Sequence, residues 1–450
     1  MKKYITIGFG ILFCACSNYL DYKPDIKMVV PKSLKDAELL LNDYTALNEG
    51  YPIYGELGTD DYYLPDANWE GVTDIDQRNN YIWADQPYRN VIQWQRPYKV
   101  VYLANQVIDI LSKLDRNNEP EKYNRTLGAA HFYRAFAFQQ LLEVFAPAYV
   151  PSTAASEMGI PIRLDPGIDG KSTRASVEGC YQQILSDYLV AANNLIVNES
   201  IVGRPNKAAA YAGMARAYLN MGDFPKAFLN AEEGLKLKNQ LMDFNQLNPN
   251  VTFPIQRFNV EVLFPATTTV SAGMNYNNGL VDSLLIKSYT TGDLRKTVFF
   301  QESDDLAGAF AFRGSFQGTS SSLFTGFTTS ELYLIKAEAG VRTNKIPESL
   351  LAINTLLRSR WDKNLTYTNV AVTNPDVLLP LILQERRKEL VFRGRRWSDL
   401  KRLNQDRRFQ KTLVRKIKGV EYKLLPNSLL YAYRLPETVI EQAEIPQNKR

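Results

Sequence analysis

The residues best suited to recognition chemistry are a cluster of tyrosines and tryptophans between positions 51 and 102. This stretch holds eight Tyr and three Trp but no Phe, although Phe occurs 21 times in the chain. Tyr and Trp combine a flat apolar face with a polar edge, which suits a half-wet binding surface better than a core. Sugar rings need such surfaces, because their C–H faces stack on aromatic rings while their hydroxyls hydrogen-bond to Asn, Asp and Gln. The segment therefore predicts carbohydrate contacts from Tyr62, Tyr63, Asn68, Trp69, Tyr81 and Trp83.

Burial in the core is the alternative interpretation for most of these rings. Trp94, Tyr98 and Tyr102 follow one another at helical spacing and are expected in the core. Trp69 differs, because it lies in the polar run PDANWEG without a helical companion. For the remaining rings both interpretations stay open, namely for Tyr62, Tyr63, Tyr81 and Trp83.

A second stretch with the same mixture of rings and amides lies near position 276. Asn275 and Tyr276 precede two further asparagines, and this composition predicts ligand contact from both residues. A plain turn is the alternative, because Asn and Gly strongly favour turns.

Side chains that perform catalysis are scarce. The single histidine, His131, lies in a strongly helical stretch, so most metal sites and most Ser-His or Cys-His sites are excluded. The carboxylates of Asp60 and Asp61 are sequence neighbours, which does not predict two groups facing each other across a glycosidic bond. No Gly-rich phosphate loop and no G-x-S-x-G motif occurs. The sequence predicts no catalytic residue, no metal and no cofactor.

Positive charge concentrates between positions 384 and 418, where fourteen Lys or Arg stand against four acidic residues. Glu385, Glu389 and Arg393 are spaced to pair along a helix, and Trp397 can stack on a guanidinium. This spacing favours a structural charge network over a nucleic-acid site.

The first sixteen residues, MKKYITIGFGILFCAC, have the form of a secretory signal. Two lysines precede a mostly apolar run that is too short to span a bilayer. Cys16 directly follows the small residue Ala15, which predicts a bacterial lipoprotein signal peptide over residues 1–15 and a lipid on the Cys16 thiol. An ordinary signal peptide is the alternative. In both cases the protein is expected to work outside the cytoplasm.

The mature chain, residues 16–450, has the composition of a globular protein, with 45% hydrophobic and 22% charged residues overall. No later apolar run approaches eighteen residues, so no membrane-spanning helix is predicted. Cys180 would be the one free thiol beside the lipidated cysteine, which excludes an intrachain disulfide.

Helical periodicity dominates the chain and predicts a mainly α fold. Residues 206–221 and 224–237 form a candidate helix pair, in which Ala215, Gly222 and Ala227 match the small and turn positions of a tetratricopeptide repeat. A weaker copy follows at 328–360. Two stretches, 51–95 and 245–327, interrupt the pattern and are predicted to be irregular inserts. Further helices are expected at 97–114, 127–145 and 176–195.

Several blocks of the sequence resemble, in the same order, the SusD/RagB family of surface lipoproteins. The most specific blocks are TSELYLIKAEAGVRTNKIPESLLAINTLLRSR and ERRKELVFRGRRWSDLKRLN. RAFAFQQLLEVFAPAYVP, GIPIRLDP and RPNKAAAYAGMARAYLNMGDFPKA are similar to the family's central helices and the loop between them. The closing segment, YRLPETVIEQAEIPQN, is similar to the family's C-terminus.

The resemblance implies a SusD-like domain over residues 16–450, with a tetratricopeptide-like helical core and a variable, loop-rich ligand-binding face. It implies a non-enzymatic lipoprotein, anchored at the surface of the outer membrane, that binds oligosaccharides and passes them to a SusC-like TonB-dependent transporter. In the family, ligand contacts come from loops that match residues 51–95 and 245–327, but no fixed motif assigns individual contacts. Peptide binding on the same scaffold is the alternative function, and a surface glycosidase is a further one.

Overall fold

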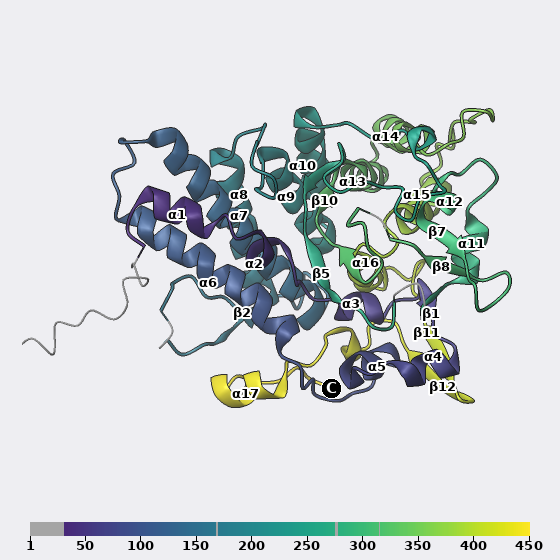
Figure 1. Cartoon of the computed structure of the whole chain (residues 1–450), viewed down its shortest axis with the longest axis horizontal. Helices are drawn as coiled ribbons and strands as arrows, with labels where there is room; N and C mark the ends of the chain where they lie inside the picture. The colour runs from purple at the N-terminus through teal and green to yellow at the C-terminus, as the bar shows by residue number, and fades with distance from the viewer. Residues whose placement is uncertain (1–30, 168–169, 275–277, 315) are drawn as a thin grey trace, which may run out of the picture.

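Helices are the main regular elements of this chain (Figure 1). The computed structural model describes residues 31–167, 170–274, 278–314 and 316–450. The predicted signal peptide, the lipid-attachment residue Cys16 and the candidate ligand residues Asn275 and Tyr276 lie outside these ranges.

The helices are unevenly long, and the two longest are neighbours in the sequence. The N-terminal half contains α1 (Leu34–Leu40), α2 (Tyr44–Asn48), α3 (Tyr54–Leu57), α4 (Asp66–Gly71), α5 (Ile75–Tyr81), α6 (Ile92–Ser112), α7 (Pro120–Phe145), α8 (Val177–Asn194), α9 (Lys207–Met221) and α10 (Phe224–Leu237). The C-terminal half contains α11 (Ser283–Ser288), α12 (Arg295–Phe299), α13 (Thr329–Arg342), α14 (Ile346–Arg358), α15 (Pro375–Glu389), α16 (Arg396–Leu403) and α17 (Glu437–Ala443). The predicted mainly α fold is confirmed.

The long helices form an array in which each packs against the next. The order of contacts is α6, α7, α8, α9, α10, α13 and α14 (Figure 1). The predicted pair of α9 and α10 is confirmed: Ala215 and Ala227 are fully buried, and small side chains there let the two helices approach. Gly222 ends α9 in the left-handed conformation with φ 76°, which a glycine adopts without strain.

The weaker copy of this pair, α13 and α14, is also confirmed. Thr328 caps α13 by accepting a hydrogen bond from the Glu331 backbone N–H. The Glu331 side chain does not complete a capping box, because its carboxylate binds Arg216 on α9 at 2.6 Å. This ion pair joins the two helix pairs.

Helix α7 lies at the centre of the hydrophobic core. Phe132 and Phe136 are fully buried, and both rings pack edge-on against Phe264 and Phe327 from the second insert. The core therefore joins the helical array to the segments that interrupt it.

The two predicted inserts meet in a four-stranded sheet with the strand order β1-β6-β8-β7. Strand β1 from the first insert pairs antiparallel with β6 from the second, with Tyr62 opposite Val281. The first insert is more regular than expected, because it forms α3, α4 and α5; Asp74, for example, caps α5 through the N–H groups of Asp76 and Gln77. The strands are β1 (Tyr62–Tyr63), β2 (Met158–Pro161), β3 (Arg174–Ser176), β4 (Val262–Phe264), β5 (Thr267–Val270), β6 (Leu280–Val281), β7 (Phe300–Glu302), β8 (Phe310–Phe312), β9 (Ser322–Phe324), β10 (Phe327–Thr328), β11 (Leu413–Ile417) and β12 (Val420–Leu424).

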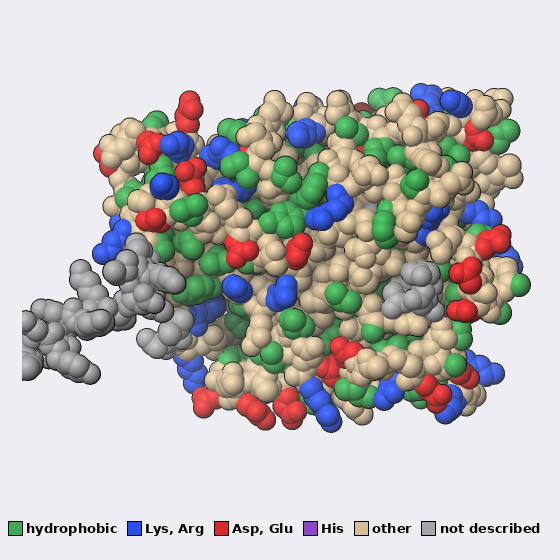
Figure 2. Space-filling view, viewed as in Figure 1, with side chains coloured by type: hydrophobic (Ala, Val, Ile, Leu, Met, Phe, Trp, Pro, Cys, Tyr) green, Lys and Arg blue, Asp and Glu red, His purple; other side chains and the backbone are tan. Residues whose placement is uncertain are grey.

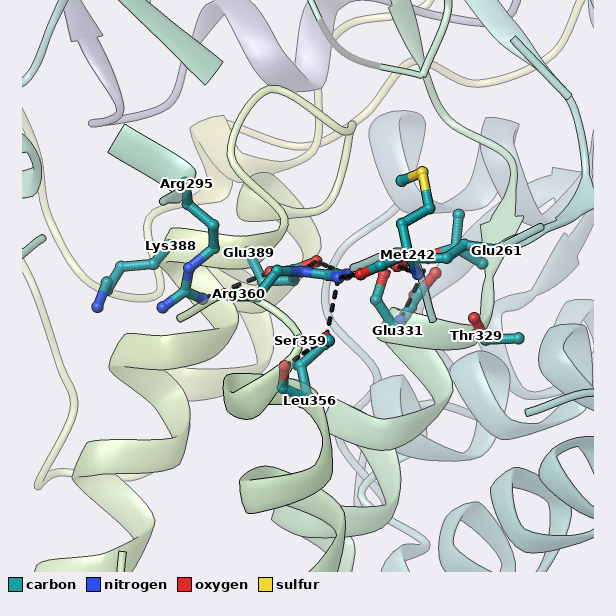
Figure 3. Close-up of polar contacts among 12 residues, drawn as sticks. Met242, Glu261, Arg295, Thr329, Glu331, Leu356, Ser359, Arg360, Lys388 and Glu389 are labelled. Atoms are coloured by element: carbon teal, nitrogen blue, oxygen red, sulfur yellow. Dashed lines mark hydrogen bonds and ion pairs between the residues drawn. The ribbon is translucent and has the colours of Figure 1, made fainter. Parts of the chain in front are cut away.

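A buried charge network is present (Figure 3), but it does not use the predicted helical spacing, because α15 ends at Glu389 and Arg393 donates to Thr328. Arg360 donates to both carboxylate oxygens of Glu389 and, at 2.7 Å, to Glu261. Arg295 reaches Glu389 from the other side at 3.4 Å. Trp397 stacks on the Tyr433 ring, with the centroids 4.9 Å apart, rather than on a guanidinium.

The outer surface carries both signs of charge. Figure 2 shows Lys and Arg interspersed with Asp and Glu over the visible face, without a continuous basic field. Several cations of the basic run are turned inward instead, including Arg386, Arg393 and Arg395, which are buried. Within the described ranges, no helix combines the length and the apolar character needed to span a membrane.

Candidate functional site

The first insert and strand β11 enclose a cavity of about 350 Å³, here called the β11 pocket. This volume is within the range of sites for small ligands. Four of the predicted ligand residues line it, so the fold brings together rings that are up to 21 positions apart. The lining residues are Thr59, Asp60, Tyr62, Tyr63, Leu64, Tyr81, Trp83, Asp282, Lys411, Thr412, Leu413, Val414, Arg415 and Lys416.

A buried arginine covers the aromatic floor of the β11 pocket. The Arg415 Cζ atom lies 3.7 Å from the centroid of the Tyr81 ring. It lies 5.0 Å from the Tyr62 centroid and 5.3 Å from the Trp83 centroid. Three rings around one cation form a cation–π cage.

The Arg415 guanidinium also donates hydrogen bonds to four backbone carbonyls of the first insert. Its Nε donates to the Tyr81 carbonyl at 2.9 Å and its Nη1 to the Tyr62 carbonyl at 2.7 Å. Its Nη2 donates to the carbonyls of Leu57 and Thr59. Arg415 therefore fixes the insert to β11.

The polar edges of the three caged rings are also engaged inside the protein. Tyr62 donates to the Leu57 carbonyl at 2.9 Å, and Trp83 donates to the Gly58 carbonyl at 2.9 Å. Tyr81 accepts from the Leu64 N–H at 2.7 Å. These three side chains are at most 5% exposed. For Tyr62, Tyr81 and Trp83 the structure corrects the prediction of ring faces open to a ligand, because Arg415 and the core occupy them.

Trp83 has a strained backbone. Its φ of 56° is in the left-handed region, which a large side chain rarely adopts. Such strain costs on the order of 1–3 kcal/mol and persists only where surrounding contacts fix the residue. The Gly58 hydrogen bond and the Arg415 contact supply that fixation.

The rim of the β11 pocket is polar and charged. Asp60 receives two hydrogen bonds from Arg396, at 2.7 and 2.9 Å, and one from Lys411 at 2.6 Å. Burial acts to raise the pKa of Asp60, but the charges of Arg396, Arg387 and Lys411 hold it well below its ordinary value. Tyr63 and Asp282 are partly exposed beside this cluster. The rim thus presents both donors and acceptors.

Trp69 and Asn68 lie on α4, which is bonded to the turn after β11 through Lys418, whose backbone N–H donates to Asp66 and whose ammonium group pairs with Glu70. The Trp69 indole N–H donates to the Arg78 carbonyl at 3.1 Å, and the Arg78 guanidinium lies 5.5 Å from the ring centroid. The Asn68 amide donates to the Asn278 carbonyl at 2.9 Å. Trp69 remains half-buried, so it is less enclosed than the caged rings.

Sequence reasoning missed the groups that β11 and the second insert contribute, above all Arg415, Lys411 and Asp282. One signal was available: Arg415 is in phase with the apolar residues Leu413 and Ile417 of a strand, and a cation at such an inward position requires partners. The sequence gives no indication that these partners are rings and carbonyls more than 330 positions away.

The carboxylates of Asp60 and Asp61 both form ion pairs with arginines. Asp61 accepts from Arg387 Nε at 2.7 Å, is 1% exposed and does not line the β11 pocket. A glycosidase needs two carboxyl groups that face the substrate, which this pair does not provide. Among the described residues, no group of His, Cys, Asp or Glu is placed to hold a metal ion.

Glu56 is a buried acid behind the pocket, with no well-formed hydrogen bond to either carboxylate oxygen. Burial and, next, the charge of Asp61 raise the pKa of Glu56 to about 8, although Arg395, Gly394 N–H and Arg396 act in the opposite direction. The folded protein therefore keeps a proton on Glu56 that the unfolded chain releases above roughly pH 4.

Glu56→Gln is expected to stabilise the protein at pH 8 by roughly 1–3 kcal/mol, with the difference vanishing near pH 4. The sign follows from proton binding: between the two pKa values the folded state binds the extra proton, so the native protein loses stability as pH rises and the glutamine variant does not. Urea unfolding of both proteins at pH 4, 6 and 8 measures this. A pH-independent difference would contradict the assignment.

Family models for two segments match this chain. One model, described as "Starch-binding associating with outer membrane", matches residues 18–219. The other, described as "SusD family", matches residues 254–437.

Two proteins of Formosa agariphila are similar over most of their length. SusD-like protein P2 is 26% identical, with 72% of this chain and 74% of the relative covered. SusD-like protein P38 is 23% identical, with 90% and 92% covered.

Solved structures share the fold. A SusD superfamily protein from Bacteroides thetaiotaomicron superposes with a TM-score of 0.75 at 24% identity, covering 93% of this chain and all of the other. A protein from Bacteroides vulgatus described as a putative sugar binding protein gives a TM-score of 0.74 at 21% identity, covering 93% and 99%. The two family models together take in most of the sequence, from residue 18 to residue 437, and this chain belongs to the SusD family.

Proposed function

We propose that this protein is a lipid-anchored, surface-exposed outer-membrane protein that binds oligosaccharides by stacking sugar rings on aromatic side chains. It delivers them to a SusC-like TonB-dependent transporter and does not alter them chemically. Lipidation at Cys16 and cleavage after residue 15 supply the anchor.

The observation that carries the proposal is the position of the β11 pocket. It lies where the first insert meets β11, and half-buried Tyr63 lines it beside carboxylates and ammonium groups. A sugar requires this combination, because it presents an apolar C–H face and hydroxyls that both donate and accept. The family model for residues 18–219 is described as starch-binding, and the similar Bacteroides vulgatus protein as a putative sugar binding protein, which supports the same function.

Peptide capture is the second candidate function, and the charge of the rim favours it. Lys411, Lys416 and Asp282 could pair with the charged ends of a short peptide. In addition, Arg415 packs against the rings of Tyr62, Tyr81 and Trp83, so these rings are not available to stack on a sugar. Glycan binding by stacking predicts that Trp69→Ala weakens the affinity for the ligand, whereas peptide binding predicts that the affinity is unchanged.

Trp69→Ala is expected to weaken oligosaccharide binding by roughly 1–3 kcal/mol if its indole is the central stacking ring. Isothermal titration of the full-length protein in detergent micelles, against a panel of neutral hexasaccharides and a tripeptide library, measures the change. Tyr102→Ala is the matched control, because Tyr102, contrary to the expectation that it lies in the core, is 43% exposed on α6 and does not line the β11 pocket. Unchanged glycan affinity in Trp69→Ala would remove this residue from the site, and binding of peptides alone would favour the second function.

The same titrations test the non-enzymatic assignment. Reducing ends are measured after incubation of each bound hexasaccharide with the protein. Sustained release of reducing ends would overturn the assignment and favour a glycosidase.

A further inference from the structure

A groove distinct from the β11 pocket lies between the segment after α10 and the segment after α14. Its cavity volume is about 570 Å³, and the rings of Trp361 and Tyr367 line it. We call it the Trp361 groove. In Figure 1, α14 lies near the upper edge of the molecule, whereas α4 and β12 lie near the lower edge.

The two rings of the Trp361 groove form a corner. Their centroids are 5.8 Å apart and their planes meet at 66°. Both side chains are half-buried, which suits rings that have one face against the protein and one toward a ligand. The Trp361 indole nitrogen is buried from solvent and has no hydrogen-bond acceptor in the described part of the chain, so its N–H is not a donor available to the groove.

Trp361 is held in place by backbone contacts on both sides. The Leu294 N–H donates to the Arg360 carbonyl at 2.9 Å, and the Asp362 N–H donates to the Gly292 carbonyl at 2.8 Å. The indole lies against Gly292, where an added Cβ would be 2.7 Å from the ring. Gly292 has φ +94°, so both its conformation and this contact exclude a side chain.

The opposite wall is fastened by the buried charge network (Figure 3). Arg360 donates to the Met242 carbonyl at 2.9 Å, and Glu261 accepts from the Met242 N–H at 2.8 Å. Asn245 then crosses the groove floor, donating to the Trp361 carbonyl and accepting from the Lys363 N–H, each at 2.9 Å. The two walls are therefore positioned by the same buried arginine, which is the support that a preorganised site requires.

Tyr367 is positioned by Asn354 on α14. Its hydroxyl donates to Asn354 Oδ1 at 2.8 Å, and Asn354 also binds the backbone of Val370 in both directions. The loop that carries the second ring is thus tied to the helical array.

Free polar groups surround the two fixed rings. Asp243 and Asp362 each use Oδ1 to bind a nearby asparagine, and no hydrogen bond within the described residues reaches either Oδ2. Lys363 and Asn239 are exposed at the edge. The charges along the groove balance, with Asp243 and Asp362 against Arg358 and Lys363. A neutral ligand with many hydroxyls fits this balance better than an acidic one.

We infer that the Trp361 groove is a second carbohydrate site, which binds a neutral oligosaccharide by stacking on Trp361 and Tyr367. The inference rests on the proposed function and extends it, because two separated sites let one protein hold a longer glycan or two glycans at once. Binding at both sites adds avidity when the linking glycan spans them.

Two variants test the groove. Trp361→Ala removes the principal ring, and Thr355→Arg places a long side chain into the groove from α14. Thr355 is partly exposed, and its hydroxyl donates to the Leu351 carbonyl within its own helix. This substitution therefore keeps the proposal falsifiable even if Trp361→Ala unfolds the protein. Circular-dichroism melts establish that each variant is folded.

The full-length protein in detergent micelles is titrated with neutral hexasaccharides of α-glucose, β-glucose, β-mannose, β-xylose and β-galactose. The expected result is two binding events per chain for at least one of them, with the groove site weakened at least tenfold by Thr355→Arg and by Trp361→Ala but kept in Trp69→Ala. Unchanged affinity and stoichiometry in the groove variants, with binding lost only in Trp69→Ala, would overturn the second site and leave the proposed function standing. If none of the glycans binds the native protein, both fail.

Discussion

Arg360→Met is expected to lower the free energy of unfolding by about 3–5 kcal/mol, because it leaves two buried carboxylates without their main counter-charge. Arg360 is 1% exposed and binds Glu389 and Glu261 together, at 2.8 and 2.7 Å. Burial raises the pKa of Glu261 even with the arginine present, so its loss leaves a carboxyl that must take up a proton or bring in water. Urea unfolding at pH 7 measures the change.

The matched control is Arg408→Met, which breaks ion pairs that are half-exposed on the surface. Surface pairs contribute about 0–1 kcal/mol, so this variant is expected to unfold close to the native protein. Equal losses in the two variants would mean that the buried network does not stabilise the fold more than a surface pair. Because Arg360 also fastens both walls of the Trp361 groove, Arg360→Met is further expected to weaken glycan binding there while the variant is still folded.

Arg415→Met is expected to lower the free energy of unfolding by about 3–4 kcal/mol, because it leaves buried carbonyls without donors and empties the aromatic cage. The methionine fills part of the space between Tyr62, Tyr81 and Trp83 but donates no hydrogen bond. Thermal and urea unfolding measure the loss, and near-ultraviolet circular dichroism reports the ordering of the released rings.

Two further substitutions make the Arg415 prediction specific. Arg415→Lys keeps the charge but not the fork of donors, so it is expected to recover only part of the loss. Lys416→Met changes the exposed neighbour on the same strand and is expected to leave stability within about 0.5 kcal/mol of the native value. Full recovery in Arg415→Lys would show that charge alone, rather than the carbonyl hydrogen bonds, holds the first insert on β11.

The helical part of the fold could be predicted because its signals are local. The alanines of α9 and α10, and the left-handed turn at Gly222, are spaced as two packed helices require. Helix capping is equally local, since the Thr328 and Ser33 hydroxyls each accept a hydrogen bond from a backbone N–H three residues further on.

The candidate site was harder to predict because composition identifies ring types but not their partners. The absence of Phe between positions 51 and 102 predicted rings that use their polar edges on a half-wet binding surface, whereas most of these rings are buried in the core, among them Tyr51, Tyr54 and Tyr88. The Tyr62 hydroxyl and the Trp83 indole N–H donate hydrogen bonds to backbone carbonyls inside the protein. The Arg415 guanidinium packs against the faces of both rings. The run WDKNLTYTN, which carries Trp361 and Tyr367, has the same mixture of rings, amides and hydroxyls and directly follows a helical repeat.

By itself, the sequence determined the helical array and the two interrupting segments, because helix periodicity and capping act over a few residues. The tertiary structure decided the buried charge network, since Glu389 binds Arg360 and Arg295, which are 29 and 94 positions away. Only the tertiary structure decided which aromatic rings are free. Whether a ring face can contact a ligand depends on which residue packs against it. Arg415 packs against Trp83, and Gly292 packs against Trp361, and both contacts join residues that are distant in the sequence.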